Sequence, residues 1–245
     1  MRDFSVVNPV SIATLKRPVW LPDGGEIVVV GHNEDSIWGT ARSGGRVIAQ
    51  LTWSPEGRLL HEKPMDGLGR GHGIEIRHDD EGRVVWCARW VDGQLHGPVV
   101  QLRDDGTPVV LTRFERGCGV DVWTQCGEVT EVREMDQGVP HGSVRWGAPT
   151  EPWEEGGYAH GKRHGILRRW NPDGSLCIGF PRFHIDDLEV SQDRYETTAR
   201  SDPSLPPYRA GDDANRRPLP PVVREALRRA AELADGFSLA EYMAS

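Results

Sequence analysis

Long apolar segments are absent from this chain of 245 residues. No run approaches the ~18–20 apolar residues that a membrane-spanning helix needs, so we expect no transmembrane helix. The N-terminus begins Met1-Arg2-Asp3-Phe4-Ser5 and lacks the basic start and the apolar stretch of a signal peptide. We therefore expect a cytoplasmic protein.

Basic clusters are also missing, because 29 basic residues stand against 37 acidic ones and the formal net charge is -8. Binding to a nucleic-acid backbone requires clustered Lys and Arg, so we expect no nucleic-acid partner. The same shortage disfavours attraction to anionic membrane lipid, although lipid binding stays open as an alternative. The acidic balance is compatible with a basic protein partner.

Cysteine is too scarce for a disulfide-stabilised secreted scaffold, since the chain has four cysteines and none forms a Cys-x-x-Cys pair. We expect reduced thiols at Cys87, Cys118, Cys126 and Cys177. A single bridge between Cys118 and Cys126 is the alternative. Phe and Tyr are few as well, at 5 and 4, against 9 Trp, 29 Gly and 18 Pro. This composition favours many turns, with Trp as the main core residue.

One turn motif recurs along the middle of the chain: a glycine, three residues and a second glycine, usually with histidine before the second. It is clear at Gly93-Gln94-Leu95-His96-Gly97 and degenerate at Gly117-Cys118-Gly119. The closing glycines of the copies are Gly73, Gly97, Gly119, Gly142 and Gly165. They are separated by 24, 22, 23 and 23 residues, which indicates a repeat of about 23 residues.

A second turn motif falls between these copies and places an acidic or polar residue before a glycine, as in Glu81-Gly82 and Asp105-Gly106. Between the turns, short segments such as Ile74-Glu75-Ile76-Arg77 alternate apolar and polar residues, which is typical of β-strands. Each repeat therefore predicts a β-hairpin. Successive hairpins predict a mainly β fold, an elongated antiparallel hairpin repeat array, because one hairpin alone is not stable.

Tryptophan recurs at one phase of the repeat, four or five residues after the closing glycine, at Trp123, Trp146 and Trp170. Because Trp buries ~150–250 Å², a fixed Trp position in a thin structure favours a packing role in the repeat core. A binding cage of aromatic side chains is the alternative.

These glycine, histidine and aromatic positions resemble MORN (membrane occupation and recognition nexus) repeats. They are most similar to the bacterial variant in proteins labelled the YwqK family of toxin–antitoxin antitoxins. The match is clear from about Gly57 to Gly179 and weak from Asp23 to Leu51. The resemblance implies a twisted β-meander and a role in protein or lipid binding. The chain departs from the pattern in using Trp where MORN repeats favour Tyr and Phe.

The composition divides the chain into four parts. Residues 1–56 are predicted to form N-terminal hairpins of degenerate repeats, and residues 57–180 the MORN-like repeats. Residues 181–221 are acidic and then Pro-rich, which predicts an extended linker. Residues 222–245 predict a C-terminal helix, from Val222 to about Ala234, and a tail. This helix is expected either to cap the exposed end of the β-array or to dock on a partner.

Candidate chemistry is sparse. His72, His96, His141 and His164 recur at turns, but equivalent turns of such a meander lie ~10 Å apart. One zinc ion needs ligands at ~2.0–2.1 Å, so we interpret these histidines as structural. The acidic turns lack a calcium-loop pattern. The segment His184-Ile185-Asp186-Asp187 places a base beside carboxylates, but no nucleophile is assigned to it. We predict no catalytic residue, no cofactor and no metal site.

The sequence therefore favours a non-enzymatic protein-binding repeat protein. An antitoxin or immunity-type partner that neutralises a cognate toxin or effector is the form that the resemblance implies. A MORN-type scaffold, membrane-associated or cytoplasmic, is one alternative. An enzyme with an unrecognised site is the other.

Overall fold

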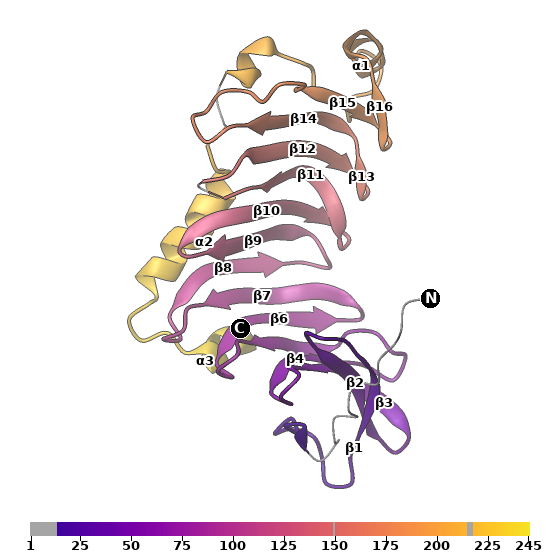
Figure 1. The fold of residues 1–245 in the computed structure, drawn as a ribbon, viewed down its shortest axis with the longest axis vertical. Helices are drawn as coiled ribbons and strands as arrows, with labels where there is room; N and C mark the ends of the chain where they lie inside the picture. Colours follow the sequence, from indigo (N-terminus) through magenta and orange to yellow (C-terminus); the bar gives the residue numbers. More distant parts are fainter. Residues whose placement is uncertain (1–13, 149, 215–217) are drawn as a thin grey trace.

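The computed structural model describes residues 14–148, 150–214 and 218–245. Strands that follow one another in sequence also lie side by side, in two antiparallel sheets (Figure 1). The predicted mainly β meander is confirmed. The first sheet contains β1 (Glu26–His32), β2 (Ile37–Ser43), β3 (Arg46–Trp53), β4 (Leu59–Pro64), β5 (Gly73–His78), β6 (Val84–Val91), β7 (Gln94–Leu102) and β8 (Pro108–Phe114). The second contains β9 (Gly119–Gln125), β10 (Glu128–Asp136), β11 (Val139–Trp146), β12 (Trp153–Ala159), β13 (Lys162–Arg163), β14 (Gly165–Trp170), β15 (Arg182–Ile185) and β16 (Leu188–Val190).

Both predicted kinds of turn close hairpins. In the first kind, two successive residues have positive φ, for example Asp92 at 51° and Gly93 at 84°. This is the backbone of a type I′ turn, which matches the twist of the flanking strands. Successive turns stack on one another, because the backbone N–H of Gly138 donates to the carbonyl of Gly117 at 3.0 Å. A Cβ on Gly117 would lie 2.6 Å from the nitrogen of Gly138, so only glycine fits there.

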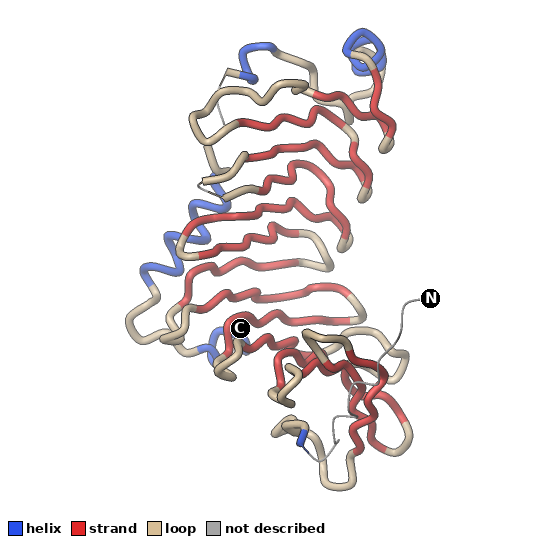
Figure 2. Tube along the Cα trace, in the orientation of Figure 1, coloured by secondary structure: helices blue, strands red, loops and turns tan. Residues whose placement is uncertain are grey.

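One face of the two sheets is covered by residues 191–214 and 218–245, which fold back along the array; we call it the covered face. The segment contains α1 (Gln192–Ala199), a short 3-10 helix at Ala210–Asp213, α2 (Pro221–Glu232) and α3 (Leu239–Ala244). Figure 2 shows these helices in blue, from α1 beside the last strands to α3 behind the first sheet. Alternate residues of the strands are apolar, and a half-apolar sheet must bury that face against another layer.

The covered face holds most of the hydrophobic core. Met243 and Ala230 pack with Cys87, Val100 and other side chains of the first sheet. Further along, α2 packs on both sheets through a shared cluster of Val110, Val122, Val129, Val132, Trp153, Trp170, Val223 and Ala226. Near the other end, α1 contributes the fully buried Tyr195 to a cluster with Phe183 and Leu205.

This arrangement corrects two expectations about the C-terminal third. Residues 181–221 are not simply a linker, since they contain β15, β16 and α1 and bury Leu205. Their carbonyls accept hydrogen bonds from strand and helix side chains, including Arg145 to Pro218 at 2.8 Å and Tyr195 to Pro206 at 2.7 Å. The helix predicted from Val222 to about Ala234 forms at Pro221–Glu232, but it lies on a sheet face and does not cap the end of the array.

The first strands are covered by residues 14–21, which precede β1, and not by the C-terminal helices. Leu15 and Leu21 pack with Leu51 and Trp53 in a separate cluster, and the indole N–H of Trp53 donates to the carbonyl of Lys16 at 2.9 Å. None of the helices in the described ranges is long and apolar enough to cross a membrane.

All four cysteines fall within the described residues, and all four are free. The alternative of a bridge between Cys118 and Cys126 is therefore wrong for this structure. Cys118 and Cys126 are exposed, whereas Cys87 is buried on the covered face, and this burial raises the pKa of the Cys87 thiol to about 12. The Sγ of Cys118 instead lies 2.9 Å from a carboxylate oxygen of Asp136 on the next turn.

Candidate functional site

The opposite face of the strands, which we call the open face, carries a row of aromatic and charged side chains from β4 to β12. Side chains alternate between the two faces of a strand. Because Cys87 and Val100 pack under α2 and α3, their neighbours Trp86 and Val99 point to the open face. The row consists of Lys63, Glu75, Arg77, Trp86, Trp90, Trp123, Glu131, Arg133, Trp146, Glu154 and Tyr158.

A stack of rings and a cation joins the two sheets on this face. The rings of Trp86 and Trp123 are nearly parallel, with centroids 6.0 Å apart and 9° between planes. The guanidinium of Arg77 lies 4.6 Å from the Trp86 ring centroid and 5.3 Å from that of Trp123. The indole N–H of Trp123 also donates to Asp121 at 2.9 Å. These rings are already satisfied within the chain.

Glu75 is the buried carboxylate of this row, with its side chain 4% exposed. It faces three basic side chains: His61 at 2.8 Å, Lys63 at 3.5 Å and Arg77 at 3.4 Å. Burial raises the pKa of Glu75, but the His61 hydrogen bond and the charges of Lys63 and Arg77 outweigh it, so the pKa lies below its ordinary value. Lys63 also lies 3.4 Å from the ring centroid of Trp90.

We expect Glu75→Gln to lower the free energy of unfolding by about 1–3 kcal/mol at neutral pH, because it removes the charge that the basic groups surround. A carboxyl group whose pKa is lowered by folding stabilises the protein above its unfolded pKa of ~4.3. That contribution is lost as the pH falls through the lower folded pKa. Urea unfolding of both proteins between about pH 7 and pH 3 should therefore show the difference shrinking in acid. An equal difference at every pH would contradict this assignment.

A groove of about 360 Å³ opens further along the same face, lined by Glu131, Arg133, Pro140, Val144, Trp146 and Tyr158. Trp146 and Tyr158 are half-buried in it. In the described part of the chain, neither side chain makes a hydrogen bond, a ring contact or a cation contact. The groove therefore contains two aromatic rings of the row that no cation, second ring or hydrogen bond of the described chain contacts.

The tryptophans at one phase of the repeat do not share one role. Trp170 is fully buried on the covered face, but Trp123 and Trp146 are half-buried on the open face. The expected packing role is thus correct for Trp170 and for Trp123, which packs against a buried cluster that contains Trp86. It is wrong for Trp146, which belongs to none of the hydrophobic clusters in the described part of the chain. Trp170 follows its closing glycine by five residues and the others by four, and a shift of one residue moves a strand side chain to the other face.

The recurrent histidines cap turns. The Nδ1 atom of His96 accepts from the backbone N–H of Arg116 at 3.2 Å, that of His141 from His160 at 3.3 Å, and that of His164 from Asp186 at 3.3 Å. Each bond joins a turn to the next turn of the same kind. This arrangement supports the structural interpretation of these three histidines, and Asp186 is placed beside His164.

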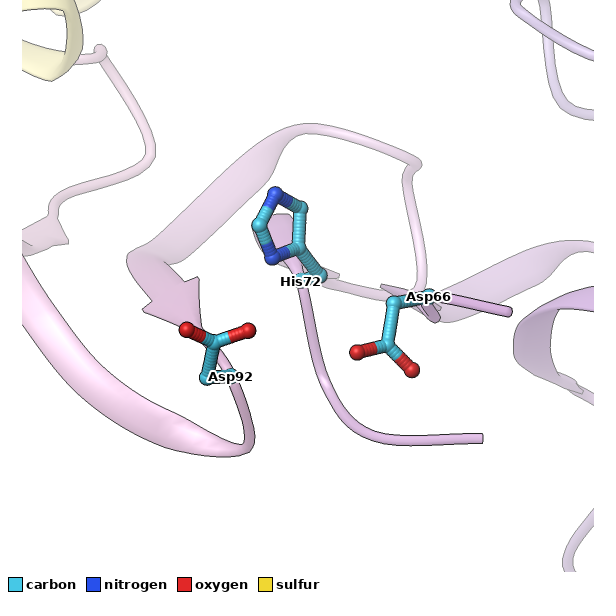
Figure 3. Close-up of side chains that lie close together, drawn as sticks. All are labelled: Asp66, His72 and Asp92. Atoms are coloured by element: carbon cyan, nitrogen blue, oxygen red, sulfur yellow. The ribbon is translucent and has the colours of Figure 1, made fainter. Parts of the chain in front are cut away.

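His72 belongs to a different group, in which its ring lies with the carboxylates of Asp66 and Asp92 (Figure 3). One potential ligand atom of each lies within 4.8 Å of the others. The guanidinium of Arg70 lies 2.8 Å from Asp66 and 2.7 Å from Asp92, so a cation of the chain itself joins the two carboxylates. The backbone N–H and the side chain of Arg70 lower the pKa of Asp66. A metal ion would have to displace Arg70.

A larger cavity, of about 720 Å³, lies on the covered face beneath residues 204–212 and 218–224. Two of its charged lining residues form close ion pairs: Arg145 lies 3.0 Å from Glu155, and Arg168 lies 2.7 Å from Asp213. The indole N–H of Trp170 donates to the carbonyl of Asp213 at 3.0 Å. These contacts hold the C-terminal segment on the sheet, so we assign the cavity a structural role.

His184 was the remaining candidate base. It is 5% exposed, and burial lowers its pKa, so the neutral ring is favoured.

No protein-family model matches the chain, and the comparison with curated proteins likewise found no match.

Proposed function

We propose that the chain is a non-enzymatic, cytoplasmic protein of the MORN-like repeat type, which binds a protein partner through its open face. The observation that carries the proposal is the row of Trp, Tyr and Arg side chains from β5 to β12, which are half-buried or exposed except for the buried Trp86. Trp, Tyr and Arg are the residues enriched at the energetic centres of protein interfaces. The covering helices bury the other face, so the open face remains for a partner.

The form of the partner follows from the resemblance and from the charge. The net charge of -8 favours a partner that is basic at the contact. A cognate toxin or effector, neutralised by having its surface covered, is the partner that the resemblance to bacterial antitoxins implies.

The test is an affinity purification of the tagged chain from a lysate of its source, followed by reconstitution with each purified stoichiometric partner. The variant Trp146→Ala with Tyr158→Ala removes the two aromatic rings of the groove, and Trp38→Ala, at a 40% exposed Trp on β2, is the control. We expect the double variant to lose the partner and the control to keep it. A partner held equally by all three proteins, or no stoichiometric partner, would overturn the proposal.

The antitoxin assignment has its own measurement. We expect the purified partner to arrest growth when expressed alone and to be harmless when co-expressed with this chain. A partner that is harmless alone would contradict the antitoxin form and leave a binding or scaffold role.

A further inference from the structure

The open-face groove between β10 and β12 differs from its neighbours in one respect. Elsewhere on the face an aromatic ring is paired with a cation of the chain, as Trp86 and Trp123 are with Arg77 and Trp90 is with Lys63. Each of those cations also lies within 3.5 Å of the carboxylate of Glu75. Rings, cations and carboxylate thus form one cluster around Glu75.

The groove around Trp146 is arranged differently, because Arg133 lines it and pairs with Glu131 without lying over an aromatic ring. In the strand register, Trp146 lies directly opposite Glu131 on β10 and directly opposite Glu154 on β12. Directly opposed residues have Cβ atoms only ~4.5–5.5 Å apart, so two carboxylates flank this indole. Among the described residues, no cation lies over the ring of Trp146 or of Tyr158.

Each of the two carboxylates pairs with one arginine of the chain. Nε and Nη2 of Arg133 both lie 2.6 Å from Oε1 of Glu131, and no hydrogen bond to Oε2 forms within the described chain. Arg169 lies 3.6 Å from Glu154. Both arginine side chains are more than two-fifths exposed, and exposed ion pairs contribute little. The groove can therefore accept a further cation.

We propose that this groove receives an arginine side chain of the protein partner, stacked on Trp146 beside Tyr158 and paired with Glu131 and Glu154. This proposal rests on the proposed function, because it names the group through which a partner is held. A planar guanidinium stacks on an aromatic ring and donates two parallel hydrogen bonds to a carboxylate, as an ammonium does not. The net charge of -8 attracts such a partner.

The first arm of the test needs no partner. The probe is the blocked peptide acetyl-Gly-Arg-Gly-amide, and the control is the same peptide with citrulline, which keeps the shape and removes the charge. Each is titrated into the full chain, and the indole N–H signal of Trp146, assigned with Trp146→Phe, is followed by NMR. We expect a saturable shift with the arginine peptide and about two- to fivefold weaker binding with citrulline, the range of an exposed cation–π contact.

Removing the flanking charges should weaken the same titration. We expect Glu131→Gln with Glu154→Gln to weaken arginine-peptide binding at least about threefold, as loss of a charged pair at a partly exposed site does. The matched control is Glu26→Gln with Glu34→Gln, which changes the net charge equally at exposed positions near β1. No shift at Trp146, or equal shifts with both peptides or both double variants, overturns the proposal.

The second arm uses the captured partner and separates the two proposals. If the partner is lost on Trp146→Ala with Tyr158→Ala but binds the Glu131→Gln, Glu154→Gln protein with unchanged affinity, the open face is the interface and the arginine assignment is wrong. If no partner is captured but the peptide binds as expected, the proposed function fails and the cation site stands.

Discussion

Replacing Val223 with aspartate is expected to lower the free energy of unfolding by about 3–5 kcal/mol, because a charge enters a buried apolar cluster without a partner. Val223 is fully buried on α2, where it packs with side chains from both sheets. The same substitution at Val222 is the control. Val222 is 50% exposed one position earlier in the same helix, so its replacement should change stability by about 0.5 kcal/mol or less.

Comparing Val223→Asp with Val222→Asp separates the cost of burying a charge from the effect of aspartate on the helix itself. Both positions lie in the first turn of α2, where a carboxylate interacts favourably with the helix dipole. Urea unfolding, followed by tryptophan fluorescence and by circular dichroism, measures both variants. Equal stability of the two variants would mean that α2 does not pack on the sheets as described.

The outcome matters because α2 contacts the sheets on both sides of the boundary between β8 and β9. Gln101 on β7 adds a second link, since its amide exchanges hydrogen bonds with the backbone of Thr124 on β9, each 3.0 Å long. On the open face, Trp86 and Trp123 stack across the same boundary. We infer that these three contacts make the two sheets one continuous surface.

The strands and turns could be predicted because their signals are local. A residue pair such as Asp92-Gly93 carries its own backbone preference, and strand alternation needs only neighbouring residues. The covering segment could not be predicted in this way. Its proline-rich composition resembles a linker, and the groups that hold it, Arg145 and Trp170, precede their acceptors by 73 and 43 residues.

The candidate interface escaped sequence reasoning for a related reason. Whether a strand residue faces the open side depends on counting single residues, and β-bulges shift the count. The register of β10 is irregular between Val129 and Glu131 and again between Arg133 and Met135. The repeat spacing therefore located the tryptophans without revealing that Trp146 and Trp170 lie on opposite faces.

The second large effect is expected for Trp170→Ala, which should lower the free energy of unfolding by about 3–5 kcal/mol. Trp170 is fully buried, and its indole holds the carbonyl of Asp213. Trp146→Ala is the matched substitution at the neighbouring repeat, and we expect it to cost about 1 kcal/mol because its ring is half-buried in an open groove.

Trp170→Ala is expected to be the more damaging variant for stability, and Trp146→Ala the more damaging variant for partner binding. Trp146→Ala should weaken the partner while remaining folded, because its ring lies on the proposed interface. Trp170→Ala, studied at a temperature where it remains folded, should bind the partner with wild-type affinity, since its ring lies on the opposite face of the sheet. Urea midpoints and titration calorimetry with the purified partner provide the two measurements. If one variant is the worse in both, a single face serves both stability and binding, and the division between covered and open faces does not describe the function.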